Sequence, residues 1–500
     1  MLKSHHFPNN PVPVGQVFLH SIFHLEVPQP HTLSYVIHGS RKTEITEFHK
    51  VEYYPLQYNT DGTPLGNLRF ALRYEPLDLN VIIASLRKID KAAIEKWVLA
   101  EPTGAYSRRT WFLYETFVGE KLDIEDASSG NYVDVLDEKF HFVSKSVNSK
   151  RYRIRNNLIG NIHLCPVIRK TIKLEQMISK NLSDVAKSAA AEYSSVEVMR
   201  AVSYLYTQET RTTFAIEGEK PSASRQQRYV SALQSISSFN PAHKHDLIQL
   251  QQAIVEPRYH ANDYRTIQNF VGSTNPQYQE DVHYICPRPD DVTYLMTGWI
   301  NLTKQLLSSH LDSVIIAAVC SFAFVYIHPF EDGNGRLHRF LIHSILNRCE
   351  YTPPGIIVPI SAVIYRKIDK YYNILNSFSQ SILEFINWEL PAGGEMVIHN
   401  NTVDLYRFPD LTLHAEFLYE CLEDAIRIDL KQELEFLAIF DRVLETIKNV
   451  VDMPDRRAHL LARLLLQNSG KLSKRKRGDY AELTDTEIEE MERGVQDLLT

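Results

Sequence analysis

The segment HPFEDGNGRLHR, residues 328–339, is the most informative part of this 500-residue sequence. It brings together an imidazole, a carboxylate, a glycine-rich turn and two guanidinium groups: His328, Asp332, Gly333-Asn334-Gly335, Arg336 and Arg339. Glycine lets backbone N–H groups approach a polyphosphate closely, a carboxylate is a hard ligand for Mg²⁺, and Arg side chains bind outer phosphates. Two or three of these residues would fit an ordinary hydrophilic turn, but the complete set predicts a site that handles a nucleoside triphosphate.

The flanking sequence places this segment between two helices. Upstream, SVIIAAVCSFAFVYI (residues 313–327) is apolar nearly all round and predicts a buried helix, although it is shorter than the roughly 20 residues of a membrane span. Downstream, RLHRFLIHSILNR (residues 336–348) has apolar residues at helical spacing. The glycine-rich turn therefore leads into a helix N-terminus, which favours an anion. Arg336 and Arg339 are three residues apart and lean over the same side of that first turn.

Residues 328–339 match the signature of Fic-domain proteins, His-x-Phe-x-(Asp/Glu)-Gly-Asn-Gly-Arg-x-x-Arg, at every fixed position, so the chain resembles this family. The resemblance implies a mainly α fold, with a helical Fic core and a β-hairpin flap. It also implies transfer of AMP from ATP to a Ser, Thr or Tyr hydroxyl of a target protein. A branch that phosphorylates its targets replaces the second glycine, whereas Gly335 is retained here. Removal of AMP and transfer of another nucleotide stay open.

The resemblance also assigns a role to each residue of the signature, with ATP as substrate and Mg²⁺ as cofactor. His328 is the general base, because an imidazole with a reference pKa of about 6.5 is neutral at cytosolic pH. Asp332 holds Mg²⁺, and the N–H groups of Gly333, Asn334 and Gly335 cradle the phosphates. Arg336 orients the β-phosphate and Arg339 the γ-phosphate. At a variable position, His338 is expected to face solvent or to lie behind the contact residues.

The segment TFAIEG (residues 213–218) resembles the inhibitory pattern of the family, Ser/Thr-x-x-x-Glu-Gly/Asn. Thr213 and Glu217 are four residues apart on one predicted helix, about 195–218, and Gly218 suits the C′ position that ends a helix. An ordinary helix end is the alternative. If Glu217 pairs with Arg339, the guanidinium is withdrawn from the γ-phosphate and the protein is autoinhibited.

The segments YRTIQNFVG (residues 264–272) and HYICPRP (residues 283–289) alternate apolar and polar residues, which predicts a β-hairpin at about 264–287. This hairpin resembles the family's flap, which holds the target segment by strand addition, and a plain surface hairpin is the alternative. Asn269 on the flap, with Tyr371 and Tyr372 on the helix after the signature, are candidates for the adenine pocket. The alternative is that this Tyr pair is structural, with one ring in the core and the other at its rim, as is usual on an amphipathic helix.

Length and composition predict two or three domains, since 44% of the residues are hydrophobic. We expect an accessory α+β region at 1–170, a Fic catalytic domain at 171–390 and a helical region at 391–500. The net charge of −7 argues against a nucleic-acid-coating protein. The basic run KLSKRKR (residues 471–477) is followed at once by acidic sequence, which favours a solvated connector over a nucleic-acid contact.

Five dispersed cysteines suit a reducing compartment and give no zinc spacing. The first residues lack an apolar signal region, so we expect a cytoplasmic protein with no membrane partner. The expected partners are ATP and an unidentified target protein on the flap, and a homodimer is left open because autoregulated relatives are often dimeric. The alternatives to an adenylyltransferase are a Fic-type de-adenylylase, a transferase of another nucleotide, and a nucleotide-binding regulatory or scaffold protein.

Overall fold

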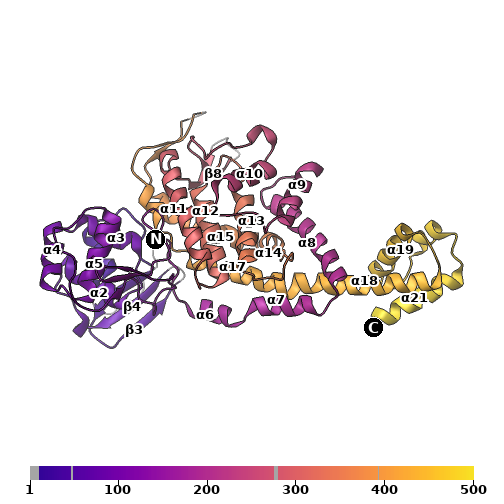
Figure 1. Cartoon of the computed structure of the whole chain (residues 1–500), viewed down its shortest axis with the longest axis horizontal. Coiled ribbons are helices and arrows are strands. Elements are labelled where there is room, and N and C mark those ends of the chain that lie inside the picture. The colour runs from indigo at the N-terminus through magenta and orange to yellow at the C-terminus, as the bar shows by residue number, and fades with distance from the viewer. Residues whose placement is uncertain (1–10, 47–48, 275–279, 392–393, 500) are drawn as a thin grey trace.

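The computed structural model describes residues 11–46, 49–274, 280–391 and 394–499. An N-terminal region, a central helical bundle and a set of C-terminal helices follow one another along the long axis (Figure 1). The predicted fold class is confirmed: the chain is mainly helical, with a mixed sheet near the N-terminus and a β-hairpin beside the bundle. Within the described residues, no helix combines the length and the hydropathy that a membrane crossing requires.

The N-terminal region is a mixed sheet packed against short helices. Its strands have the order β1-β2-β4-β3, and β2 and β4 run parallel. They are β1 (Val12–Val14), β2 (Thr32–Ile37), β3 (Lys42–Ile45) and β4 (Lys50–Pro55). The helices are α1 (Gln16–Ile22), α2 (Pro64–Tyr74), α3 (Leu79–Lys88), α4 (Lys91–Ala100) and α5 (Ala105–Leu113). A second sheet has the order β5-β7-β6 and consists of β5 (Val133–Asp134), β6 (Val147–Ser149) and β7 (Ile154–Asn156).

The central bundle surrounds α12 (Ser313–Ile327), whose side chains are almost all buried, as the apolar run predicts. It packs against α11 (Pro289–Leu307), α13 (Asn334–Arg348) and α17 (Thr412–Asp424). The preceding helices are α6 (Ile172–Ser179), α7 (Leu182–Ala191), α8 (Ser195–Ile216), α9 (Ala223–Gln234) and α10 (Lys244–Ile254). The remaining ones are α14 (Ile360–Arg366), α15 (Ile368–Leu383), α16 (Val403–Arg407) and α18 (Lys431–Val450).

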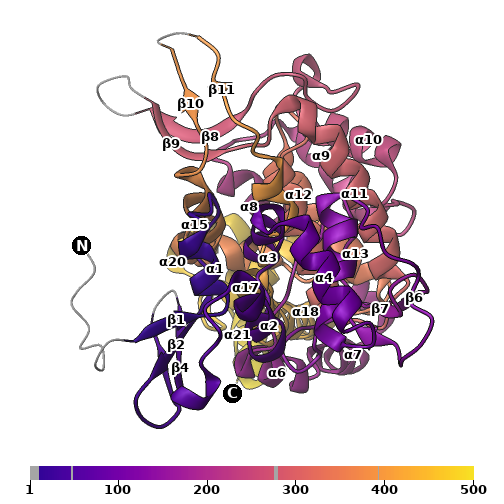
Figure 2. The ribbon, with the colours of Figure 1, turned by 90° about the vertical axis from the view of Figure 1, so that its left-hand side faces the viewer.

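Two hairpins project from the same end of the bundle (Figure 2). The first pairs β8 (Phe270–Thr274) with β9 (Glu280–Ile285) in antiparallel register and coincides with the predicted flap. The tip of the predicted flap, residues 275–279, lies outside the described residues. The second hairpin pairs β10 (Trp388–Glu389) with β11 (Val397–Ile398).

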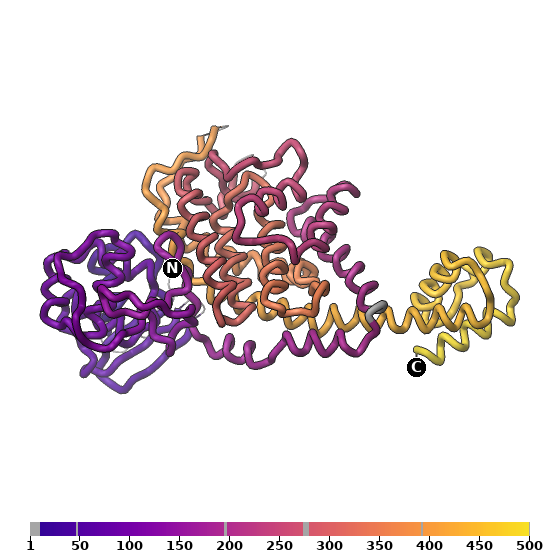
Figure 3. Tube along the Cα trace, in the orientation of Figure 1, coloured from indigo at the N-terminus to yellow at the C-terminus, as the bar shows by residue number. Residues whose placement is uncertain are grey.

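The central hydrophobic core continues past residue 390. Buried side chains of α16, α17 and the start of α18, up to Leu437, belong to the same cluster as α12 and α13. A separate cluster begins at Phe440 and joins the rest of α18 to α19 (Asp455–Gln467) and α21 (Asp485–Leu499), with α20 (Lys474–Arg477) between them. The tube in Figure 3 shows α18 carrying these helices away from the bundle. The predicted domain boundary at residue 390 stays a prediction. We propose a domain boundary inside α18, between Leu437 and Phe440, because the two hydrophobic clusters meet there.

Helix α8 runs from α18 to the signature loop and is fastened to the bundle along one face. Tyr206 donates to the carbonyl oxygen of Gly355 at 2.8 Å, and Glu209 accepts the backbone N–H of Ser361 at 2.9 Å. The fully buried Glu209 carboxylate also meets the Nε2 atom of His343 on α13 at 2.9 Å. Burial raises the pKa of Glu209, but His343 and Ser361 outweigh that effect and hold it below its ordinary value.

Glu209→Ala is expected to lower the free energy of unfolding of the central domain by about 3–5 kcal/mol, because it removes the buried carboxylate that Ser361 and His343 contact and leaves buried polar groups without a partner. Urea denaturation followed by tryptophan fluorescence measures the loss as a lower midpoint. Thr207→Ala is the matched control on the same helix, since its exposed hydroxyl donates to the carbonyl of Ser203 within that helix. Equal midpoints for the two variants would show that the Glu209 contacts contribute nothing to the attachment of α8.

Candidate active site

His328 stands at the C-terminal end of α12 in the left-handed conformation, with φ 51° and ψ 59°. Its backbone N–H donates to the carbonyl of Phe324 at 3.0 Å, and its Nδ1 atom lies 3.0 Å from the carbonyl oxygen of Val325. Because a carbonyl only accepts, Nδ1 carries the proton and Nε2 keeps the free lone pair. Burial lowers the pKa of His328 to about 4, so the ring is neutral at physiological pH.

The turn after His328 is closed by a side chain of its own. Asn334 donates from Nδ2 to the carbonyl of Phe330 at 2.7 Å and accepts the Phe330 N–H at 3.0 Å. Phe330 is fully buried beneath the turn. Gly333 has φ 93°, and a Cβ there would lie 2.7 Å from Val255 Cγ2. The turn therefore favours glycine at residue 333. The side-chain amide of Asn334 shapes the loop, and its backbone N–H is one of those predicted to bind phosphate.

Glu217 lies over the first turn of α13. A Cβ built on Gly335 would stand 2.2 Å from Glu217 Oε1, so the carboxylate fills the space that the glycine leaves. Arg339 is 1% exposed and donates to Glu217 Oε1 at 2.6 Å, to Thr213 Oγ1 at 2.6 Å and to the Thr213 carbonyl at 2.9 Å. The structure thus brings together Thr213, Glu217, Gly335 and Arg339, which are distant in the sequence.

The end of α8 explains how Glu217 reaches this position. Gly218 has φ 69°, the Glu219 N–H donates to the Phe214 carbonyl at 3.0 Å, and the Gly218 N–H donates to the Ala215 carbonyl at 3.0 Å. This is a Schellman motif with Gly218 at C′, as the sequence predicts. Glu217 is the residue between the last helical position, Ile216, and this glycine.

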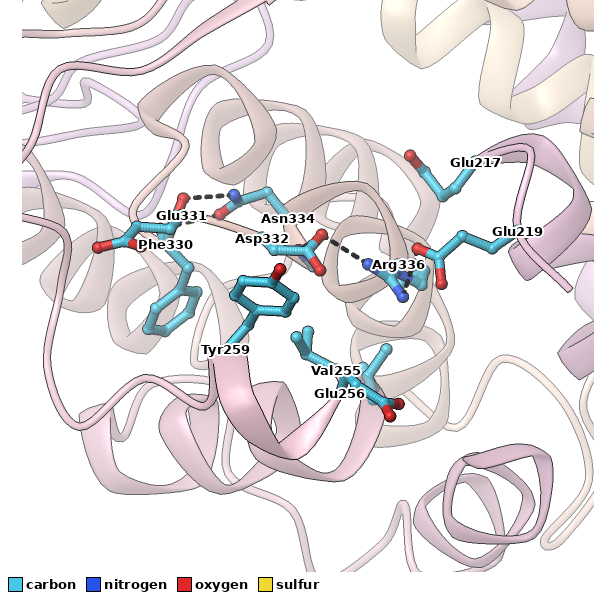
Figure 4. Close-up of polar contacts among 12 residues, drawn as sticks. Glu217, Glu219, Val255, Glu256, Tyr259, Phe330, Glu331, Asp332, Asn334 and Arg336 are labelled. Carbon is cyan, nitrogen blue, oxygen red and sulfur yellow. Dashed lines mark hydrogen bonds and ion pairs between the residues drawn. The ribbon is translucent and has the colours of Figure 1, made fainter. Parts of the chain in front are cut away.

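Glu219 is a charged contact that the sequence analysis did not predict. Its Oε1 atom lies 2.8 Å from Arg336 Nη1, while Arg336 Nη2 donates to Asp332 Oδ1 at 2.7 Å (Figure 4). Glu219 also pairs with Arg225 at 2.8 Å. The only sequence signal was a second acidic residue two positions after Glu217. Both signature arginines are therefore engaged by carboxylates from the end of α8.

A cavity of about 470 Å³ opens beside His328, between the flap and α15. Tyr372, 46% exposed, lines it, whereas Tyr371 is buried in the core; their assignment to an adenine pocket stays a prediction. Asn269 is not among the lining residues, because its Nδ2 atom donates to the carbonyl of Glu331 at 3.2 Å. The lining residues that the sequence analysis missed include Ser273, His283, Asn376 and Ser379. Asn376 and Ser379 follow Tyr372 at helical spacing, which could have indicated them.

His338 does not face solvent. Its ring is buried behind the loop, with its centroid 4.6 Å from that of Phe322 and 6.2 Å from that of Tyr371. Burial lowers the pKa of His338 to about 3, so it stays neutral and fills the core of α13.

The first turn of α13 fits a phosphate group. It lacks a Cβ at Gly335, an anionic oxygen of Glu217 already lies against it, and Arg336 Nε has no hydrogen-bond partner among the described residues. Asp332 is 46% exposed and is the carboxylate of the loop nearest this turn. In the described part of the chain, no group of three or more His, Cys, Asp or Glu could hold a metal. Mg²⁺ bound to nucleotides needs only one or two carboxylates beside phosphate oxygens and water, so these residues fit it.

Residues 241–346 match the Fic/DOC family model. Among curated relatives, the protein adenylyltransferase Fic of Culex quinquefasciatus is 34% identical over 118 residues, covering 22% of this chain and 21% of the relative. The Drosophila melanogaster protein of the same name is 32% identical over 133 residues, covering 26% and 23%. Residues 241–346 thus resemble a Fic/DOC domain, and the chain is distantly similar to these relatives over about a quarter or less of their length. The family-model match includes the β8–β9 hairpin and residues 328–339, but it begins after Thr213 and Glu217.

Among solved structures, a Fic family protein from Desulfovibrio desulfuricans G20 aligns with 63% of this chain and 90% of its own, at 16% identity and a TM-score of 0.40. Fic-1 of C. elegans aligns with 43% of this chain and 71% of its own, at 20% identity and a TM-score of 0.29.

Proposed function

We propose that the protein is an adenylyltransferase that transfers AMP from ATP to a Ser, Thr or Tyr hydroxyl of a target protein. One observation carries the proposal: a neutral histidine of fixed tautomer borders a cavity large enough for a nucleoside and directly precedes a phosphate cradle. The family match and the adenylyltransferase relatives support the same chemistry.

In this proposal His328 Nε2 accepts the proton of the target hydroxyl. The hydroxyl oxygen forms a bond to the α-phosphorus of ATP while the bond from that phosphorus to the bridging oxygen of the β-phosphate breaks, and pyrophosphate leaves. The N–H groups at the start of α13, together with Arg336 and Arg339, hold the phosphates in place. Asp332 would hold Mg²⁺, which supplies positive charge to the phosphate oxygens when bound.

The flap supplies the docking site for the target in this proposal. Strands β8 and β9 pair only with each other within the described residues, so each offers a free edge to an extended segment. Ser273 and His283 of the flap line the cavity that His328 borders. A segment added to this hairpin would bring its hydroxyl toward the base.

Glu217 holds the enzyme in its resting state. Its carboxylate fills the space over Gly335 and engages Arg339, so a triphosphate reaches its productive pose only after Glu217 moves away. Isotopically labelled ATP tests the reaction on the Glu217→Gly protein. Transfer of label from the α-phosphate with loss of the γ-label supports adenylylation, whereas transfer of the γ-label alone would replace it with phosphorylation.

Glu219→Gln is expected to raise the rate of AMP incorporation a further two- to fivefold in the Glu217→Gly background, because it frees Arg336. The effect is modest, since a partly exposed ion pair contributes about 0.2–1 kcal/mol. Incorporation is measured by intact mass against time. Glu256→Gln is the matched control, because Glu256 lies 3.8 Å from Arg225 without contacting Arg336. Equal rates for the two variants would remove Glu219 from the account of inhibition.

A further inference from the structure

Arg265 is a buried cation that forms no ion pair with a carboxylate in the part of the chain that the structure describes. It is 4% exposed and gives its donors to backbone carbonyl oxygens. Nε donates to His328 at 2.8 Å, Nη1 to Ile267 at 2.8 Å and Nη2 to Pro287 at 2.5 Å. Its backbone N–H donates to the carbonyl of Pro329 at 2.8 Å. Burial of a charge without a counter-ion is costly, and the carbonyl acceptors offset part of that cost.

The four carbonyl groups belong to two parts of the candidate active site. His328 and Pro329 begin the signature loop, and Ile267 and Pro287 stand at the two feet of the β8–β9 flap. One side chain therefore ties both feet of the flap to the backbone of the histidine. The fixed planar fork of a guanidinium reaches these separate acceptors, which a lysine ammonium does not.

His328 needs such support because its backbone is strained. A non-glycine residue with φ 51° persists only where its surroundings fix it. The Phe324 carbonyl fixes its N–H, the Val325 carbonyl fixes its ring, and Arg265 fixes its carbonyl oxygen. Loss of the Arg265 side chain removes the constraint on the His328 carbonyl, so the strained backbone that carries the imidazole is held by fewer contacts.

We propose that Arg265 is a positioning residue for catalysis, which sets the His328 imidazole and the flap in one fixed relation. The proposal rests on the adenylyltransferase function proposed above. The charge of Arg265 has a second effect, since it disfavours the imidazolium form of His328. Glu217 and Asp332 act in the opposite direction, and burial is the largest influence on the His328 pKa. The other titratable side chains that line the same cavity are His283, Tyr284, Tyr326 and Tyr372.

The test uses the full-length Glu217→Gly protein as parent and adds Arg265→Lys or Arg265→Gln. Both variants are expected to lower the rate of AMP incorporation at saturating ATP by about thirtyfold or more, with the KM for ATP within about twofold of the parent. Lysine keeps the charge, so Arg265→Lys leaves the acid limb of the pH–rate profile in place. Glutamine removes the charge, raises the pKa of the base and moves that limb to higher pH.

Arg108→Lys is the matched control. Arg108 is 2% exposed, lies in the N-terminal region and likewise donates to backbone carbonyls, those of Thr103, Gly104 and Asn131. It is expected to lower the melting temperature without changing the rate of the folded protein. If Arg265→Lys does only the same, Arg265 is a structural residue and the proposal is overturned.

A parent that incorporates no AMP would refute the proposed function while Arg265 can still be tested. The Cε1–H resonance of His328, assigned by its loss in His328→Ala, is followed by NMR against pH in the parent and in Arg265→Gln. A titration at higher pH in Arg265→Gln supports the contact between Arg265 and His328. Identical titration curves overturn it, whatever the enzyme's reaction.

Discussion

Glu217→Gly is expected to raise the rate of AMP incorporation by roughly ten- to hundredfold. The 2.6 Å contact between Glu217 and the buried Arg339 is charge-assisted, and such a contact contributes about 1.5–3 kcal/mol. Its removal frees Arg339 for the γ-phosphate and empties the space over Gly335. Intact-mass spectrometry with MgATP detects one added AMP for each modified site without knowledge of the natural target.

Glu192→Gly is the control for this prediction, because it removes an exposed glutamate from the end of another helix, α7. It is expected to leave the rate at the low value of the unmodified protein. Equal incorporation by the Glu217 and Glu192 variants would remove autoinhibition from the account. The pairing of Glu217 with Arg339 would then have only a structural role.

His328→Ala in the Glu217→Gly background is expected to lower the rate of incorporation by about 10²–10⁴-fold, the usual contribution of a positioned general base. ATP binding is expected to stay within about threefold of the parent, because the phosphates are held by α13 and its arginines rather than by the imidazole. Single-turnover rates measure the first effect, and isothermal titration calorimetry measures the second.

His310→Ala is the matched control, an exposed histidine in the loop between α11 and α12. Its rate is expected to equal that of the parent. A His328→Ala protein that keeps the parental rate would show that another group takes the proton. Loss of ATP binding together with the rate would instead place His328 among the residues that hold the substrate.

Local patterns predicted the helices around the site well. The apolar run from Ser313 to Ile327 is α12 with the same bounds, because a segment that is apolar on every side is stable only when buried as a helix. Helix α13 begins two residues before the predicted start, since the chain enters the helix directly after Gly333. The flap hairpin was legible from its alternation and its turn residues.

Contacts between segments that are distant in the sequence could not be predicted from local patterns. Glu217 and Arg339 are 122 positions apart, and only the family resemblance suggested their pairing. Glu219 had only the weak signal of a second acidic residue near Glu217, and Arg265 had none. Both residues lie in loops, where hydrophobic periodicity does not indicate contacts. His338 reads as a polar residue at a variable position, yet the bundle closes over it. The catalytic and inhibitory roles stay predictions until variants are measured.

The missing side chain at Gly335 has a consequence for how this protein can evolve. Glu217 Oε1 lies 2.2 Å from where a Cβ at residue 335 would be, so the resting carboxylate occupies the volume that our proposal assigns to a phosphate. A methyl group at residue 335 would displace the Glu217 carboxylate, and we expect it also to obstruct the phosphate in the proposed reaction. Substitutions that tune the strength of the proposed inhibition are therefore expected at the end of α8, around Glu217, and not at residue 335.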